Sequence, residues 1–260
     1  MARPLFNKIV TAVIDHDPFF HNNIDCTGKE GISGLVKCTS SIRQLAYGVH
    51  AEFLDEYTQI SERSSRLALD HFCQSVMQIY GPEYLRKPTV TDVKKLYLHH
   101  EEKHEFPGML GSLDCTDWEC NINVLYQSPL FNDLKTGRAP KIPFVANGVT
   151  YPSGYYLVDG IYPELAPLVK TISKPVDDDH KQILYKQKQE SARKDVERAF
   201  GVLKKEWAIP ANPTRALKKE RIINMMYTCI ILHNMIRKYK KYAISPKWFP
   251  EEMHQLDDPL

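Results

Sequence analysis

The chain has 260 residues, of which 43% are apolar and 25% are charged, and this composition is typical of a folded globular protein. Its length allows one large domain or two small ones. No run approaches the roughly 20 consecutive apolar residues of a membrane helix, and the first residues lack the apolar segment of a secretory signal. The six cysteines include no Cys-x-x-Cys pair. We therefore expect a reduced, intracellular chain with Cys38, Cys73 and Cys229 as small core residues.

The net charge of +2 conceals an asymmetry along the chain. Between Lys181 and Lys241 there are 16 Lys and Arg residues against 5 Asp and Glu residues, a local balance of +11, whereas the remaining residues have a balance of −9. A basic C-terminal third favours a polyanionic partner such as DNA. A solvated helix surface with no such partner would have the same composition.

The first hundred residues have the apolar spacing of helices. The spacing predicts one helix over residues 5–13 and a second over residues 35–46, which Gly48 closes. Ser61 can cap a third, longer helix that we expect to end at Gly81-Pro82.

These predicted helices have the order of a helix-turn-helix. In that arrangement the start of the last helix, residues 62–66, would face DNA through Arg63 and Arg66. A plain helical bundle fits the same spacing, and the spacing by itself favours the bundle.

From residue 83 onward the predicted elements are mixed. Thr91 is the expected cap of a connecting helix that runs to about His104. A second helical pattern covers residues 123–134. Short strands, or extended segments, are predicted over residues 110–115, 142–151, 154–158 and 168–172.

The last third of the chain predicts two helices. The first begins near Asp178, and its apolar stripe consists of Val196, Ala199, Phe200, Leu203 and Trp207. The second covers roughly residues 219–239 and is apolar enough to be buried.

Three acidic residues lie where they could converge. Asp114 and Asp159 each end a predicted strand, and Glu197 lies on the long helix at the edge of its apolar stripe. Carboxylates are the ligands that Mg²⁺ and Mn²⁺ prefer, and such ions can activate water and stabilise the leaving oxygen in phosphodiester cleavage. Ordinary surface acids would give the same pattern. The helix that carries Glu197 also has basic residues that could contact a phosphate backbone: Arg193, Lys194, Arg198, Lys204 and Lys205.

Five longer motifs occur in a fixed order: FPGMLGSLDC (106–115), INVLYQSPLF (122–131), GYYLVDGIYP (154–163), ARKDVERAFGVL (192–203) and ILHNMI (231–236). Together they strongly resemble the PIF/Harbinger class of DDE transposases, in its plant nuclease-like branch. The resemblance implies an α/β fold with an RNase H-like sheet flanked by helices, behind an all-helical N-terminal region with a helix-turn-helix-like segment. It also implies a catalytic, metal-binding triad of Asp114, Asp159 and Glu197 with Mg²⁺ or Mn²⁺.

The same resemblance implies the biological setting and the domain organisation. DNA would be the substrate, a Myb-like DNA-binding protein a partner, and the nucleus the location. The predicted organisation is a helical, DNA-binding region (1–82), a connecting helix (83–105), a DDE nuclease-like domain (106–242) and an irregular tail (243–260).

Residues 115–125 depart from the family pattern. The chain passes straight from the first motif to the second, where the family has a long stretch that supplies two strands beside the first catalytic strand. Asp117 stands where family members have His, and Asn121 where they have an acid. Loss of two strands would expose unpaired backbone groups, at a cost of several kcal/mol against a total stability of roughly 5–15 kcal/mol.

Two functions therefore remain open. The first is a DDE endonuclease-like protein with a truncated sheet, whose activity the truncation threatens. The second is a non-catalytic, domesticated transposase that binds DNA or chromatin.

A competing motif, His-Glu-x-x-His, lies at residues 100–104 and is typical of zinc peptidases. Pro107 ends the helix at once and no third ligand follows, so the sequence predicts a polar helix end rather than a zinc site.

Overall fold

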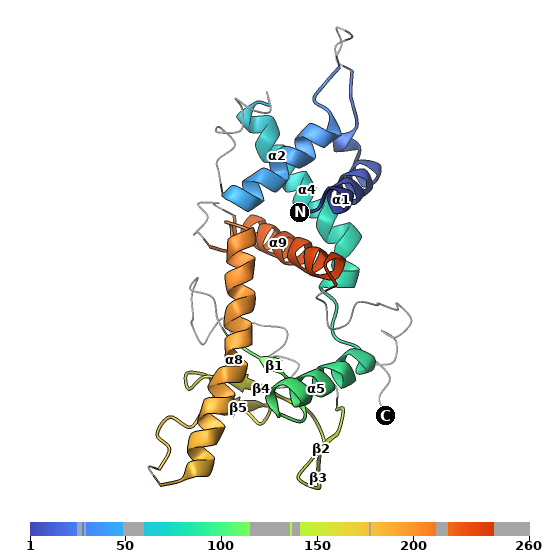
Figure 1. Ribbon diagram of the computed structural model, residues 1–260. Coiled ribbons are helices and arrows are strands. Elements are labelled where there is room, and N and C mark those ends of the chain that lie inside the picture. The colour runs from blue at the N-terminus through green and yellow to red at the C-terminus, as the bar shows by residue number, and fades with distance from the viewer. Residues whose placement is uncertain are drawn as a thin grey trace. The chain divides into compact units, whose positions relative to one another are not determined.

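The computed structural model describes residues 1–24, 28, 30–48, 60–114, 136, 141–176, 178–211 and 218–241. These residues form two compact units, the first made of Met1–Arg86 and the segment that begins at Val202, the second of Lys87–Gly201. The first unit is helical, and the second combines helices with a small parallel sheet (Figure 1). The predicted α/β fold class is confirmed. Among the described residues, no helix has both the length and the apolar character needed to span a membrane.

The first unit packs its helices around one apolar core. Its elements are α1 (Arg3–His16), the short helix η1 (Pro18–Phe20), α2 (Gly34–Tyr47), α4 (Glu62–Tyr84) and α9 (Lys219–Tyr239). Apolar residues three and four positions apart give these helices a buried stripe. Leu203 and Trp207, at the end of α8 (His180–Glu206), join the same core.

Cys38, Cys73 and Cys229 lie in this core as free, buried thiols, which confirms their prediction as core residues. Burial raises the pKa of the Cys38 and Cys73 thiols to about 12. They therefore stay protonated at neutral pH and are poor nucleophiles.

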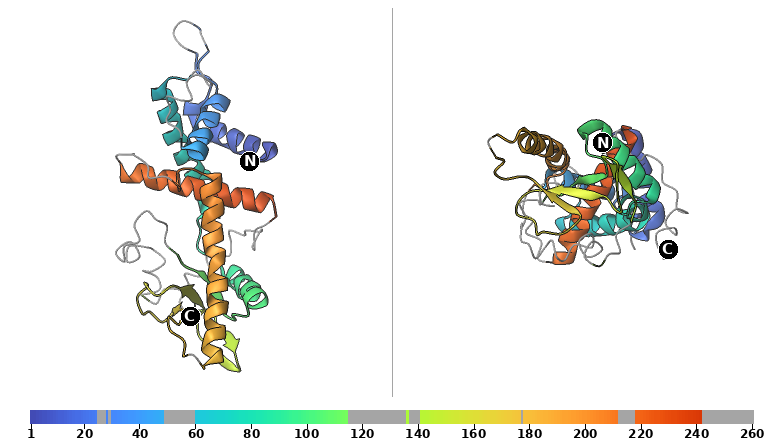
Figure 2. Two further views of the ribbon diagram at one scale, coloured as in Figure 1. Left: turned by 60° about the vertical axis from the view of Figure 1, so that its left-hand side comes forward. Right: turned by 90° about the horizontal axis from the view of Figure 1, so that it is seen from below.

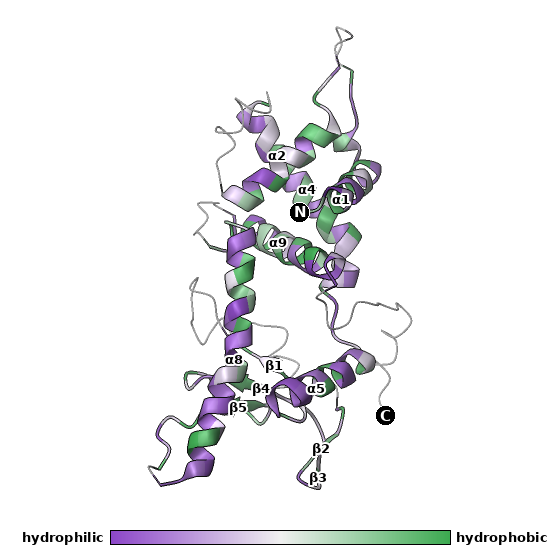
Figure 3. Ribbon diagram, in the orientation of Figure 1, coloured by the Kyte–Doolittle hydropathy of each residue, from purple (hydrophilic) through white to green (hydrophobic). Residues whose placement is uncertain are grey.

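Helix α9 is buried along one face only. Apolar residues extend along much of the helix (Figure 3), but Ile223 and Tyr227 remain 39% and 40% exposed. The prediction of a buried last helix is therefore correct for the face that carries Cys229 and Leu232.

Two helix ends test the boundaries that the sequence predicts. Gly48 closes α2 as expected, with a φ of 63° and an N–H that donates to the Gln44 carbonyl. The prediction that α4 ends at Gly81-Pro82 is wrong, because the helix continues to Tyr84. Helix α9 holds this last turn: Lys238 Nζ lies 2.5 Å from Glu83 Oε1 and 5.7 Å from the centre of the Tyr84 ring. The join between α2 and α4 lies outside the described residues, as does residue range 123–134.

The second unit begins with α5 (Val90–His104), whose N-terminus differs from the prediction. Thr89, not Thr91, is the cap: its hydroxyl accepts the Asp92 N–H, and the Asp92 carboxylate accepts the Thr89 N–H. Such a capping box needs an acidic or amide side chain three residues after the cap. Thr91 has Lys94 at that position, so it could not form the reciprocal bond.

Three short parallel strands form the sheet, in the order β1-β4-β5. They are β1 (Met109–Ser112), β4 (Tyr155–Val158) and β5 (Leu168–Lys170), each close to a predicted strand but shorter. The extended segment at 142–151 is an antiparallel hairpin of β2 (Phe144–Ala146) and β3 (Val149–Tyr151). Asn147 and Gly148 form its turn with φ values of 50° and 75°, because two-residue hairpin turns favour residues that tolerate positive φ.

The sheet lies between α8 and α5 (Figures 1 and 2). Met109 and Leu157 pack against Ala192 of α8, whereas Leu110 packs with Val93 and Tyr97 of α5. The apolar stripe predicted for α8 is correct only at its end. Leu203 and Trp207 are buried, Val196 and Phe200 are half-buried, and Ala199 is exposed. The part of α8 that packs on the sheet lies earlier in the helix, where Gln189 and Ala192 are buried.

Candidate site at the carboxyl edge of the sheet

Asp114 and Asp159 follow the carboxyl ends of the neighbouring strands β1 and β4. In the parallel register Ser112 pairs with Leu157, and the Leu113 N–H donates to the Leu157 carbonyl at 2.9 Å. Two further steps along the same register, beyond the last paired residues, would set Asp114 opposite Asp159. Neighbouring strands are about 4.8 Å apart, so both carboxylates belong to one small region of the edge.

The Asp159 side chain lies on the sheet face that α8 covers, where it contacts Arg193. Leu113 and Val158, the residues just before them, pack together in a cluster with Tyr162 and Leu168. Leu157 packs on the other face, against α8. Because side chains alternate between the two faces of a sheet, Asp159 shares the α8 side with Leu157, and continued alternation predicts the same side for Asp114.

The Asp159 carboxylate has two partners. Its Oδ1 accepts the Ile161 N–H at 3.0 Å, and its Oδ2 lies 3.5 Å from Arg193 Nη2 of α8. The Arg193 side chain is only 13% exposed, and its Nε is buried without a hydrogen-bond partner among the described residues. A guanidinium charge therefore lies beside the aspartate that ends β4.

Gln189 sets the position of α8 over the strand ends. Its Nε2 donates to the Val158 carbonyl at 3.0 Å, and the side chain is fully buried. Residues four apart lie one turn further along the same helix face, so Arg193 follows Gln189 and reaches Asp159. Glu197 follows Arg193 by another turn and is exposed.

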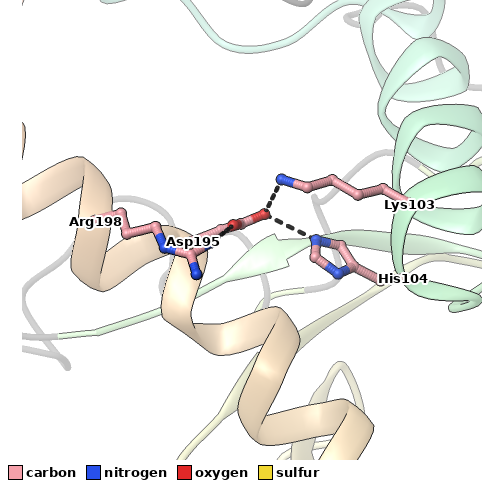
Figure 4. A network of polar contacts seen from close by, with 4 residues as sticks. All are labelled: Lys103, His104, Asp195 and Arg198. Carbon is pink, nitrogen blue, oxygen red and sulfur yellow. Dashed lines mark hydrogen bonds and ion pairs between the residues drawn. The ribbon is translucent and has the colours of Figure 1, made fainter.

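A second carboxylate on α8, Asp195, links this helix to α5 (Figure 4). Its Oδ2 accepts hydrogen bonds from Lys103 Nζ at 2.6 Å and from His104 Nε2 at 2.8 Å, and its Oδ1 accepts one from Arg198 Nη1 at 3.1 Å. Burial by itself would raise the pKa of Asp195, but the hydrogen bonds from Lys103 and His104 outweigh it and hold the pKa below 3.8. Asp195 is therefore ionised at neutral pH.

The site fits a divalent cation in part. Two carboxylates at neighbouring strand ends are an oxygen donor set that suits Mg²⁺ or Mn²⁺. Within the described ranges, however, no three His, Cys, Asp or Glu residues are grouped closely enough to hold a metal ion. The structure thus places Arg193 next to Asp159, and within the described ranges Asp114, Asp159 and Glu197 do not form a metal-binding group.

The basic residues singled out on α8 occupy different settings. Lys194 and Lys205 are exposed, Lys204 is half-buried, and Arg198 is 70% exposed while it contacts Asp195. Arg193 is the exception, because it faces the sheet edge rather than solvent.

The two histidines of the His-Glu-x-x-His motif also lie near this network. Their rings stack with centroids 5.9 Å apart. Burial, followed by the positive charge of His99 and His104 in their protonated forms, lowers the pKa of His100 to about 4. His104 is engaged by Asp195, so the described part of the chain offers this pair no zinc site.

Sequence reasoning did not single out Gln189 or Asp195, and it treated Lys103 and His104 only as part of another motif. Gln189 carries a detectable signal, because it lies four residues before Arg193 and eight residues before Glu197, on the same face of the helix. The partners of Asp195 carry none, since they are about 90 residues away and only the packing of α5 beside α8 brings them close.

A protein-family model described as "Plant transposon protein" matches residues 82–121 and 119–242, which together cover more than half of the chain. The two matched segments meet at residues 119–121, within the stretch where the sequence departs from the resemblance. No curated protein and no solved structure matches the chain.

Proposed function

The chain belongs to the plant transposon protein family, and on this premise we propose that it is a PIF/Harbinger-type DDE endonuclease-like protein that cleaves DNA with Mg²⁺ or Mn²⁺. The observation that supports the proposal is the parallel pairing of β1 with β4, because Asp114 and Asp159 follow the carboxyl ends of these two neighbouring strands. Carboxylates on rigid neighbouring strands are suited to hold divalent cations for phosphodiester hydrolysis.

Each residue of the edge has a role in this proposal. Asp114 and Asp159 would hold a divalent cation. Glu197 would become the third carboxylate ligand through a movement of its side chain toward the two aspartates. A cation bound there would supply Lewis-acid stabilisation to the phosphate and to attacking water. Gln189 fixes α8 on β4, and Arg193 neutralises Asp159. Lys194, Arg198, Lys204 and Lys205 would contact the DNA backbone.

Conversion of supercoiled plasmid to nicked circles tests the activity. We expect the full chain to nick plasmid in Mg²⁺ or Mn²⁺ and not in EDTA. Asp159→Asn and Asp114→Asn should each lower the rate at least about 100-fold, because each removes a charged ligand while keeping side-chain volume. Glu101→Gln, which changes an exposed acid of α5, is the matched control and should leave the rate unchanged. Equal rates in Asp159→Asn and wild type would disprove the assignment of Asp159.

A second candidate function is non-catalytic binding of DNA or chromatin. The Arg193–Asp159 contact favours it, because a guanidinium already balances one of the two aspartates. The break in the family match at residues 119–121 also favours it, since a missing segment there would produce such a break. Salt-sensitive binding of duplex DNA, without nicking in either metal, would decide for this candidate. Both candidates include the nuclear location and the Myb-like partner that the resemblance implies.

A further inference from the structure

A hollow of about 330 Å³ lies on the first unit, between the start of α4 and the start of α9. The residues that line it are Glu62, Arg63, Arg66, Leu67, Asp70 and Arg221. Arg221 is some 150 residues away from the others in sequence, and the packing of α9 on α4 places its guanidinium beside them.

The carboxylates of this hollow hold two of the three arginines in place. Arg221 Nε donates to Asp70 Oδ1 at 2.6 Å, and Arg66 pairs with Glu62 one turn earlier on α4. Arg63 is exposed, and the described residues include no ion-pair partner for it. Three positive and two negative groups leave the hollow with a net charge of +1.

The arginines keep donors that these contacts do not use. A guanidinium has five N–H donors in a planar fork, so one bond to Asp70 leaves most of those of Arg221 for another acceptor. The Arg221 and Arg66 side chains are 31% and 57% exposed, so an incoming group can reach them. Leu67, at 44% exposure, adds an apolar wall that suits a sugar ring.

We propose that this hollow binds a backbone phosphate of DNA, with Arg63, Arg66 and Arg221 as the donors. Phosphate oxygens match the fork of a guanidinium, and such contacts position a protein on DNA without reading its sequence. The inference rests on the DNA binding that the proposed function includes, but it requires no cleavage. It adds Arg221 of α9 to the arginines that the sequence suggests on α4.

Binding of a fluorescent 20-base-pair duplex, measured by anisotropy in EDTA over a range of salt concentrations, tests this proposal. We expect Arg221→Gln and Arg63→Gln each to weaken binding about fivefold and to reduce the salt slope by about one. Lys8→Gln, which removes an exposed charge on α1 away from the hollow, should change affinity less than twofold.

Asp70→Asn separates a phosphate contact from a purely structural ion pair. Both Asp70→Asn and Arg221→Gln break the same pair, so a structural role predicts that both weaken DNA binding. The proposal instead predicts that Asp70→Asn tightens binding two- to fivefold, because it removes a negative charge beside the phosphate. Weaker binding by Asp70→Asn, or unchanged binding by Arg221→Gln, would overturn the proposal.

The probe also distinguishes DNA from an acidic protein partner. Suppose that a labelled poly-glutamate peptide binds as tightly as the duplex and that Arg221→Gln weakens both by the same factor. The hollow then binds acidic polymers in general, and the DNA assignment is wrong. If the wild-type chain binds no duplex in EDTA, the inference also fails. If the wild-type chain binds the duplex but does not nick plasmid, only the proposed cleavage is contradicted.

Discussion

The contact between Arg193 and Asp159 affects whether the sheet edge can bind a divalent cation. Asp114 and Asp159 follow neighbouring strands at one edge of the sheet, and carboxylates that lie close together repel each other unless a positive group lies nearby. Arg193, nearly buried and 3.5 Å from Asp159, is such a group. A divalent cation at the same carboxylates would have to share the space with this guanidinium or displace it.

Removal of the Arg193 charge should therefore tighten metal binding. We expect Arg193→Gln to bind Mn²⁺ about tenfold more tightly than wild type, a difference of about 1.4 kcal/mol, by isothermal titration calorimetry. Lys194→Gln removes an exposed charge from the neighbouring position and should leave the affinity within about twofold. Equal affinities for the Arg193 variant and wild type would show that Arg193 does not compete with the ion.

His100 is a buried titratable group of α5. The groups that act on it are His99, Lys103 and His104 on its own helix and Asp195 on α8. Burial lowers its pKa to about 4, so the folded unit holds it neutral, whereas the unfolded chain takes up a proton near pH 6.5. Stability that depends on neutral His100 is therefore present above pH 6.5 and is lost as the pH falls toward 4.

His100→Gln should remove this part of the acid sensitivity. In wild type we expect the opening free energy of α5 to fall by up to about 3 kcal/mol between pH 6.5 and pH 4, measured by amide hydrogen exchange. The variant should have a flatter profile over that window, since glutamine takes up no proton. His180→Gln, at the exposed start of α8, is the control and should keep the wild-type slope. An unchanged slope in His100→Gln would contradict this account.

At the scale of elements, Asp195 is the main polar link between α5 and α8 among the described residues. It lies two positions after Arg193 and two before Glu197, so it fixes the segment of α8 that faces the sheet edge. Its bonds to Lys103 and His104 come from the last turn of α5, just before the chain enters β1. Asp195 thus couples the orientation of α8 about its own axis to the position of β1.

Asp195→Asn should loosen this link. We expect a loss of about 1 kcal/mol in the protection of α5 and of the middle of α8 against hydrogen exchange at pH 7. Because the pKa of Asp195 is lowered in the folded state, the same stability should disappear in wild type as the pH falls below 3.8. Glu190→Gln, an exposed acid on the same helix, is the matched control. If α5 and α8 were equally protected against hydrogen exchange in Asp195→Asn and Glu190→Gln, Asp195 would not link the two helices.

Local chemistry explains which element boundaries the sequence predicts. Gly48 ends α2 because the left-handed conformation it adopts costs glycine little. The end of α4 was mispredicted because Lys238, far away in sequence, holds the turn that follows Pro82. The start of α5 was mispredicted by two residues, although the capping box of Thr89 and Asp92 was present in the sequence.

At the scale of the whole chain, long-range packing decides the organisation. Helix α9 and the end of α8 bury their apolar residues with α1, α2 and α4, so segments far apart in the sequence share one core. The basic segment from Lys181 to Lys241 therefore contributes to both compact units. No local sequence pattern predicts that α9 packs with the N-terminal helices, because the apolar face of a helix does not specify its partner.

Local sequence is enough to predict the strands that precede Asp114 and Asp159, the long helix that carries Glu197, the buried cysteines and the membership of a transposon family. These follow from short-range periodicity, turn residues and motifs, which are properties of neighbouring positions. Only the tertiary structure decided that Arg193 lies beside Asp159, that Asp195 binds α5, and that Arg221 joins Arg63 and Arg66. Each of these contacts joins residues at least 34 positions apart, and the direction of a side chain at such a distance depends on how helices and strands pack, not on local sequence.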